Sequence, residues 1–167
     1  MKNYSPMRKD INHIKVKCMG ITILTVGKKN SSEYSDMIDE YMKRISSFIS
    51  IRMKFIKDSG NLKEDRESAV KQESERILKE VCKEKFVILL DRKGESIDSE
   101  RFSDLFNNNN ICFVIGGIYG VDERVKKRAS RIISFSRMTF PHKLFRVILL
   151  EQIYRGYMIH KNMRYHK

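Results

Sequence analysis

Several things that this 167-residue sequence lacks exclude whole classes of protein. It has only three cysteines, Cys18, Cys82 and Cys112, and their wide spacing forms neither a disulfide framework nor a Cys-x-x-Cys metal site. No apolar run approaches the roughly 18 residues that a membrane span needs. The first nineteen residues are polar and basic and do not form a secretory signal. We therefore expect a cytoplasmic protein that uses no metal and crosses no membrane.

Acidic residues are scarce relative to basic ones. Lys and Arg number 34 against 21 Asp and Glu, which gives a formal net charge of +13 and a pI near 9.7. Such an excess in one domain's length of chain indicates attraction to a polyanion, and nucleic acid is the leading candidate. Lys, Asn and Ile are all abundant, as in chains from AT-rich genomes, so base composition is an alternative explanation of the charge. The charge indicates a partner and not a reaction.

Apolar runs of strand length alternate with segments of helical periodicity along the chain. Five such strands, joined by helices and without an internal repeat, predict a single α/β domain whose mostly parallel sheet is flanked by helices. Residues 1–19 are expected to be a loose basic extension before a domain at 20–167, and translation could begin at Met19. The expected strands are 21–26, 49–55, 86–90, 111–115 and 132–135, and the expected helices are about 34–48, 68–82, 98–106, 122–130 and 141–160.

Three local predictions concern the faces and ends of these elements. Met and Tyr side chains recur at helical spacing in the stripe from Tyr34 to Phe48 and are expected to lie in the core. The segment 91–94, Asp-Arg-Lys-Gly, is expected to end the third strand and form a loop. Asp98 or Ser99 is the expected N-terminal cap of the short helix that follows.

A ligand site is expected where loops 90–94, 116–120 and 136–140 converge, because open parallel sheets bind ligands beyond the carboxyl ends of their strands. The glycines of Gly116-Gly117-x-x-Gly120 allow the backbone to approach a ligand closely, although a tight strand-to-helix turn explains them equally well. The spacing is not the dinucleotide fingerprint, Ser136 stands where that fold has an acidic residue, and no Walker A motif occurs. A nicotinamide-dependent Rossmann enzyme is therefore a weaker alternative.

Aromatic, hydroxyl and cationic residues are mixed in segment 135–142, which leads into the last expected helix. The N-terminus of a helix favours an anion. His142 and Arg146 are four residues apart, so they share one face of the first turns of that helix. A solvated surface histidine and an ion-paired arginine are the ordinary alternatives for these two residues.

Motifs spread over most of the chain together carry a resemblance to a known family. They are Ile21–Lys28, Phe113–Gly120, Phe135–Val147, Leu150–Arg155 and the terminal Tyr165-His166-Lys167. In their order and spacing, from about residue 20 to the last residue, they resemble the ribosomal RNA large subunit methyltransferase H family of the SPOUT superfamily. The resemblance implies a SPOUT-type fold with a C-terminal trefoil knot, working as a homodimer.

The resemblance also implies an activity. It is methyl transfer from S-adenosylmethionine to N3 of a pseudouridine in 23S rRNA, with the assembled ribosome as substrate and without a metal. The positions that match the family's cofactor-binding residues are Leu90, Gly116, Phe135, Ser136, Arg137, Met138, Thr139 and Phe140.

Methyl transfer from a sulfonium requires alignment of N3 with the methyl group and removal of one imide proton. We expect Arg146 to stabilise the developing negative charge, and His142, or His166 from the partner's tail, to take the proton. Tyr165 in the same tail could stack on an unpaired base. The stretch before Met19 has no counterpart in the family. Two alternatives stay open: a SPOUT methyltransferase that acts on transfer RNA, and a non-catalytic basic ribosome-binding factor.

Overall fold

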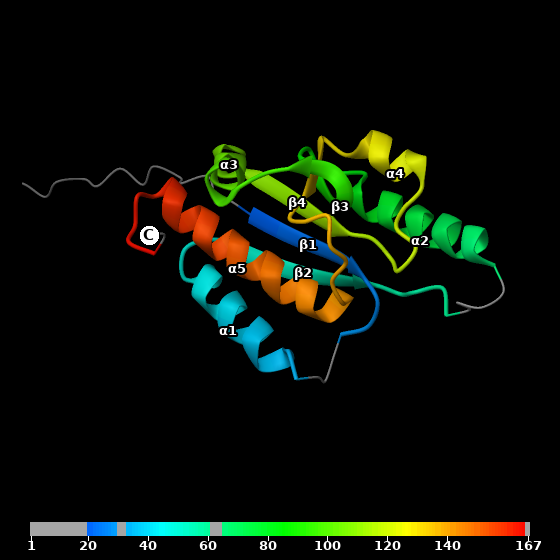
Figure 1. The fold of residues 1–167 in the computed structure, drawn as a ribbon, viewed down its shortest axis with the longest axis horizontal. Helices are drawn as coiled ribbons and strands as arrows, with labels where there is room; N and C mark the ends of the chain where they lie inside the picture. The colour runs from blue at the N-terminus through cyan, green and yellow to red at the C-terminus, as the bar shows by residue number, and fades with distance from the viewer. Residues whose placement is uncertain (1–19, 30–32, 61–64, 166–167) are drawn as a thin grey trace, which may run out of the picture.

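A central sheet with helices on both of its faces forms the computed structural model of this protein (Figure 1). The structure describes residues 20–29, 33–60 and 65–165. The expected extension at residues 1–19 lies outside these described residues. Within the described ranges, none of the helices has both the length and the apolar character needed to span a membrane.

The sheet is parallel throughout. Its strands are β1 (Gly20–Val26), β2 (Ser50–Ile56), β3 (Val87–Ser96), β4 (Asn110–Ile115) and β5 (Arg131–Ser134). They lie in the order β2-β1-β4-β3-β5, and each neighbouring pair is parallel. The register places Ile23 between Met53 of β2 and Phe113 of β4. The predicted α/β domain with a parallel sheet is therefore confirmed, and the carboxyl ends of the strands meet at one edge.

Helices cover both faces of this sheet. They are α1 (Ser35–Ser46), α2 (Arg66–Val81), α3 (Ser99–Ser103), the short 3-10 helix η1 (Asp104–Asn107), α4 (Glu123–Arg128) and α5 (His142–His160). The carboxylates of Asp65, Asp98 and Asp122 cap α2, α3 and α4 by accepting backbone N–H groups of the first turn. The expected cap at Asp98 is confirmed. Helices α1, α3 and α5 pack on one face, and α2 and α4 pack on the other.

The core consists of two apolar layers, one on each face of the sheet. In β4, Phe113 and Ile115 belong to the layer under α1, α3 and α5, whereas Cys112 and Val114 belong to the layer under α2 and α4. Successive strand side chains point to opposite faces, so a strand covered on both sides is apolar at every position. Since helices occupy both faces, the loops at the strand ends are left to form a site.

The apolar stripe on α1 is only partly buried, so the prediction that its side chains are core is wrong in part. Ile45 is buried, whereas Met37 and Phe48 are each 44% exposed. The reason is the position of α1, which contacts β2, an edge strand of the sheet, and α5. Part of its apolar face therefore extends past the core.

The third strand is longer than expected, and the prediction that segment 91–94 ends it is wrong. β3 continues to Ser96, because after a register shift between Leu90 and Glu95 the strand pairs with β5 again. Gly94 permits this close approach, since a β-carbon there would lie 2.7 Å from the carbonyl oxygen of Ile132. Turn-forming residue types therefore lie in an irregular strand and not in a free loop.

Gly156 of α5 is predicted to be required for packing against the rings of Phe102 and Phe106. A β-carbon added to it would lie 2.9 and 2.8 Å from these two rings. Gly156→Ala adds helix propensity of about 1 kcal/mol, but overpacking a filled core costs about 1–3 kcal/mol. The expected net change is a fall of up to about 2 kcal/mol in the free energy of unfolding, measured in urea. Lys143→Ala on the exposed side of the same helix should change it by less than about 0.5 kcal/mol, and a more stable Gly156→Ala protein would contradict the packing.

Candidate cofactor-binding cavity

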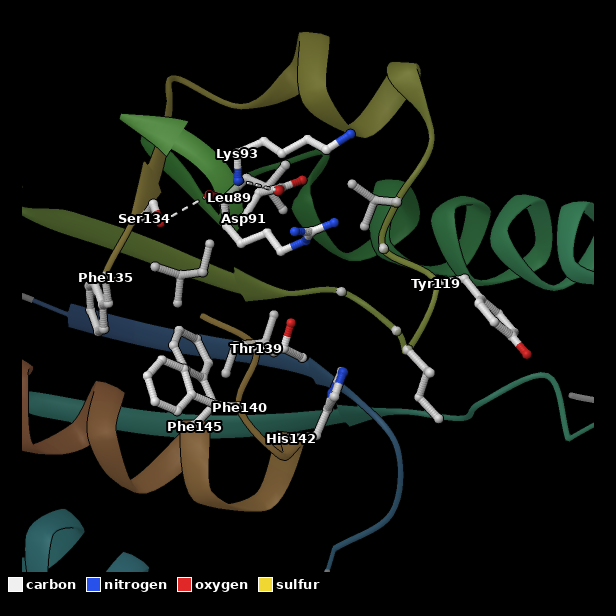
Figure 2. Close-up of a pocket in the computed structure, with 18 of the residues that line it drawn as sticks. Leu89, Asp91, Lys93, Tyr119, Ser134, Phe135, Thr139, Phe140, His142 and Phe145 are labelled. Carbon is white, nitrogen blue, oxygen red and sulfur yellow. Dashed lines mark hydrogen bonds between the residues drawn. The ribbon is translucent and has the colours of Figure 1, made fainter. Parts of the chain in front are cut away.

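A cavity of about 560 Å³ lies beyond the carboxyl ends of β4 and β5 and beside the middle of β3, where the register of that strand shifts (Figure 2). Its lining comes mainly from segments 89–93, 115–121 and 133–142. These segments include most of the three stretches that the sheet argument expected to converge, although the first of them is an irregular part of β3 and not a loop. The volume lies within the ordinary range of small-molecule sites.

Seven of the eight residues that the resemblance assigns to a cofactor line this cavity. Arg137, the eighth, is exposed and is not among the lining residues. Hydrogen bonds within segment 134–138 hold its shape. The hydroxyl of Ser134 donates to the carbonyl of Ser136 at 2.9 Å, and the hydroxyl of Ser136 accepts from the backbone N–H of Met138 at 3.0 Å. The seven residues are Leu90, Gly116, Phe135, Ser136, Met138, Thr139 and Phe140.

The glycine loop after β4 forms one wall of the cavity. A β-carbon on Gly116 would lie 2.7 Å from Cγ1 of Val121, and one on Gly117 would collide with Oε2 of Glu73. The backbone N–H of Gly120, a residue with φ of +83°, donates to the carbonyl of Gly117 at 2.9 Å. The loop is thus both a tight strand-to-helix turn and a surface that presents backbone to the cavity. These residues fit a small ligand held close to main-chain atoms.

Aromatic rings form a second, apolar wall. Phe145 packs against Phe135 and Phe140, with ring centroids 5.5 and 6.1 Å away, and the planes of Phe140 and Phe145 differ by 22°. Phe102, from the core, meets Phe135 edge-on at 5.5 Å. In Figure 2, Phe140 and Phe145 overlap near the start of α5, and Phe135 lies to their upper left. Such a wall suits a planar heterocyclic ring.

Positive charge dominates the rest of the lining. Among the described residues around the cavity, Arg66, Arg92, Lys93 and Lys126 are basic, and Asp91 is the only acidic one. Asp91 accepts the backbone N–H of Lys93 at 2.9 Å, the bond that is dashed beside these two labels in Figure 2. An excess of cations at a cavity attracts polyanions.

Sequence reasoning missed Arg66 and Lys126 as lining residues, whereas Tyr119 lies in the expected loop 116–120. The Arg66 guanidinium lies 5.1 Å from the centre of the Tyr119 ring, and both residues line the cavity. Arg66 begins α2 and Lys126 lies in α4, and neither belongs to a motif. The net charge was the only available indication, because tertiary packing alone brings these helices beside the loops.

Among the described residues, no group of three or more His, Cys, Asp or Glu is placed to hold a metal ion.

His142 lines the cavity from the first residue of α5. Burial is the main cause that lowers the pKa of His142 below its ordinary value of 6.5, and the nearby charge of Arg146 lowers it further. The negative charge of Glu73 partly opposes these effects. The imidazole is therefore mainly neutral near pH 7 and able to accept a proton.

Arg146 does not line the cavity and is buried, with 3% of its surface exposed. Its guanidinium donates to the hydroxyl of Thr25 and to the carbonyls of Val26 and Lys28, at distances of 3.1 to 3.2 Å. It also lies 5.2 Å from the centre of the Phe55 ring. Burial lowers its pKa. The geometry supports a positioning role for Arg146, and charge stabilisation on a substrate stays a prediction.

The C-terminal tail turns back after α5, and Tyr165 packs beside the second half of that helix (Figure 1). The ring of Tyr165 meets that of Tyr154 edge-on at 4.8 Å, and the Arg155 guanidinium lies 5.0 Å from its centre. Burial raises the pKa of Tyr165. Tyr154 comes twelve residues after His142, which is about 18 Å along the helix axis. The structure does not bring Tyr165 to its own cavity, and His166 lies outside the described residues.

The chain is similar to known proteins in sequence and in fold. The family described as predicted SPOUT methyltransferase matches residues 19–166. The protein named ribosomal RNA large subunit methyltransferase H from Clostridium botulinum (strain Kyoto / Type A2) is 45% identical over 161 residues, which cover 89% of this chain and 100% of that protein. The protein named ribosomal RNA large subunit methyltransferase H 1 from Clostridium perfringens (strain SM101 / Type A) is 42% identical over 159 residues, with the same coverage.

A solved structure shares the fold at low sequence identity. The tRNA (m1G37) methyltransferase from Aquifex aeolicus matches with a TM-score of 0.50 and 16% identity, over 83% of this chain and 69% of that one. The likeness supports the architecture alone. Because the family match spans the whole described domain and the relatives align over their full length, the chain belongs to the SPOUT methyltransferase family.

Proposed function

We propose that this protein transfers a methyl group from S-adenosylmethionine to N3 of a pseudouridine in 23S rRNA, with the assembled ribosome as substrate. The observation that carries the proposal is the cavity, where three separate segments of the chain bring together seven of the eight expected cofactor residues. The 45% identity to a protein named ribosomal RNA large subunit methyltransferase H supports ribosomal RNA as the substrate. A ribosomal substrate places the protein in the cytoplasm.

The lining residues suit this cofactor. The aromatic wall of Phe135, Phe140 and Phe145 offers apolar contact to adenine, and the backbone around Gly116 can hydrogen-bond to polar edges of the nucleoside. When bound, the cofactor supplies a methyl group already activated on a sulfonium. The chain's own residues must then align the base and accept its imide proton.

His142 is the residue that we assign to the proton. It lines the cavity, and its lowered pKa keeps the imidazole neutral at physiological pH. Arg146, four residues later, fixes the start of α5 against β1 and thereby orients His142. Arg66, Arg92, Lys93 and Lys126 supply positive charge for phosphates of the RNA.

A homodimer would place a second tail at each cavity. Ile118 and Met138 line the cavity and are 67% and 72% exposed, so they offer an apolar surface that a second copy could cover. Because Tyr165 packs against Tyr154 and does not line the cavity of its own chain, we propose that Tyr165 and His166 act at the cavity of the partner. The C-terminal trefoil knot stays a prediction of the resemblance.

The proposed reaction predicts which RNA accepts the methyl group. With labelled S-adenosylmethionine, we expect label on ribosomes that lack the modification, and none on free 23S rRNA or bulk tRNA. Mass mapping should locate the label on a pseudouridine. Label on tRNA would contradict the proposed substrate, and ribosome binding without any cofactor binding would indicate a non-catalytic factor.

A base role for His142 predicts a specific pH dependence. Only the neutral imidazole accepts a proton, so kcat should rise with pH through a midpoint below 6.5 and be flat above it. In His142→Asn we expect kcat to fall about 100-fold or more and the rise to disappear. An unchanged rise in the variant would assign the titration to another group, which excludes His142 as the base.

Action of the tail in trans predicts that two inactive variants rescue each other. One variant is His142→Ala, and the other carries Tyr165→Ala and His166→Ala. Co-expressed at equal levels, they form mixed dimers in which one cavity has a native His142 and a native partner tail. Random pairing gives about a quarter of native cavities and the same share of wild-type turnover. No recovery of turnover in the mixed dimers would place the tail at its own chain's cavity.

A further inference from the structure

Glu73 of α2 is a buried acidic residue, with 4% of its surface exposed. Its Oε1 accepts the backbone N–H and the hydroxyl of Ser59, at 3.1 and 3.2 Å. Within the described ranges of the chain, Oε2 accepts no hydrogen bond and Glu73 forms no ion pair. A buried carboxylate is costly unless its charge is balanced. The negative charge of Glu73 is therefore not balanced by any contact among the described residues.

Oε2 lies directly behind the glycine wall of the cavity. A β-carbon on Gly117 would collide with this atom, so Oε2 touches the backbone of the loop between β4 and α4. Gly117 lines the cavity, whereas Glu73 does not. The backbone of Gly117 thus lies between the carboxylate and the cavity. The negative charge of Glu73 acts on a residue that lines the cavity. Burial and the charge of Arg146 lower the pKa of His142, and Glu73 partly opposes this lowering.

The net positive charge around the cavity disfavours the binding of a cationic ligand. Arg66, Arg92, Lys93 and Lys126 attract RNA, but the same cations repel a positively charged sulfonium. Asp91 is the only acidic residue among the described lining residues. A negative charge that is shielded from solvent is less screened by salt than an exposed one. Glu73 has this property.

We infer that Glu73 is a positioning residue whose carboxylate, behind Gly117, is the counter-charge for the sulfonium of S-adenosylmethionine. The inference rests on the proposed function, because it takes this cofactor as the ligand of the cavity. The inference predicts a difference in affinity between S-adenosylmethionine and S-adenosylhomocysteine, two ligands that differ only in the methyl group and charge of the sulfur. Affinity for S-adenosylmethionine depends on the charge of Glu73, whereas affinity for S-adenosylhomocysteine, whose sulfur is neutral, does not.

A purely structural role for Glu73 gives a different expectation. The neighbouring Ser74 also holds the glycine loop, because its hydroxyl accepts the backbone N–H of Asp122 at 2.9 Å. If Glu73 served only to support the loop, its loss would distort the cavity and weaken both ligands equally. The ratio of the two affinities therefore distinguishes charge from support.

The test is calorimetric titration of Glu73→Gln with each of the two ligands. Gln keeps the size of the side chain and an oxygen that can accept from Ser59, but it removes the charge. We expect the preference for S-adenosylmethionine over S-adenosylhomocysteine to fall about tenfold relative to the wild type, which corresponds to about 1.4 kcal/mol. Ser74→Ala is the matched control, because it loosens the same loop without changing a charge, and it should leave the preference unchanged.

Other results would overturn the inference. An unchanged preference in Glu73→Gln, with both affinities reduced, would show that Glu73 only supports the loop. A loss of preference in Asp91→Asn and not in Glu73→Gln would assign the counter-charge to Asp91. A wild-type protein that binds neither ligand would refute the proposed function itself, and the inference with it.

A measurement on the wild-type protein covers the case in which Glu73→Gln does not fold. Sinefungin carries a protonated amine where S-adenosylhomocysteine has no charge. We expect it to bind about tenfold more tightly than S-adenosylhomocysteine, since the same counter-charge acts on it. Equal affinities of these two ligands for the wild type would overturn the inference.

Discussion

The buried guanidinium of Arg146 is the interaction on which the geometry of the cavity depends. It joins the start of α5 to the carboxyl end of β1 through the hydroxyl of Thr25 and the carbonyl of Val26. His142, one turn earlier, and the loop that precedes it take their positions from this connection. Without the guanidinium, a buried hydroxyl and a buried carbonyl would lose this donor, which is costly in a closely packed region. The arginine is thus part of the framework that holds the site.

Two requirements on charge meet at the same cavity. Basic residues from α2, α4 and β3 favour the approach of RNA, yet the proposed methyl donor is itself a cation. The two kinds of charge occupy different places. The cations line the cavity, where phosphates can reach them, whereas the Glu73 carboxylate is buried behind Gly117, where salt screens its charge less. The absence of a side chain at Gly117 is what allows a negative charge so close to the ligand.

Local pattern predicted much of the fold. β1 and β4 were expected to within one residue, because a strand buried on both faces is apolar at successive positions. The predicted end of β3 was wrong, because the strand pairs with β5 again after the turn-forming residues that follow Leu90. The stripe on α1 was wrong in part, because periodicity shows which residues share a face and not what covers it. In the site, family motifs supplied the eight expected cofactor positions, seven of which line the cavity, whereas Arg66, Lys126 and Glu73 lie outside those motifs.

The sequence by itself determined the parallel α/β class, the positive charge and the three segments that meet at the cavity, because each follows from residue types at close spacing along the chain. Tertiary structure alone decided that Arg146 faces β1, that Tyr165 packs on Tyr154 outside its own cavity, and that Glu73 abuts Gly117. These relations join residues that are distant in the chain. They depend on how helices pack across the sheet, and no local pattern of residues encodes such contacts.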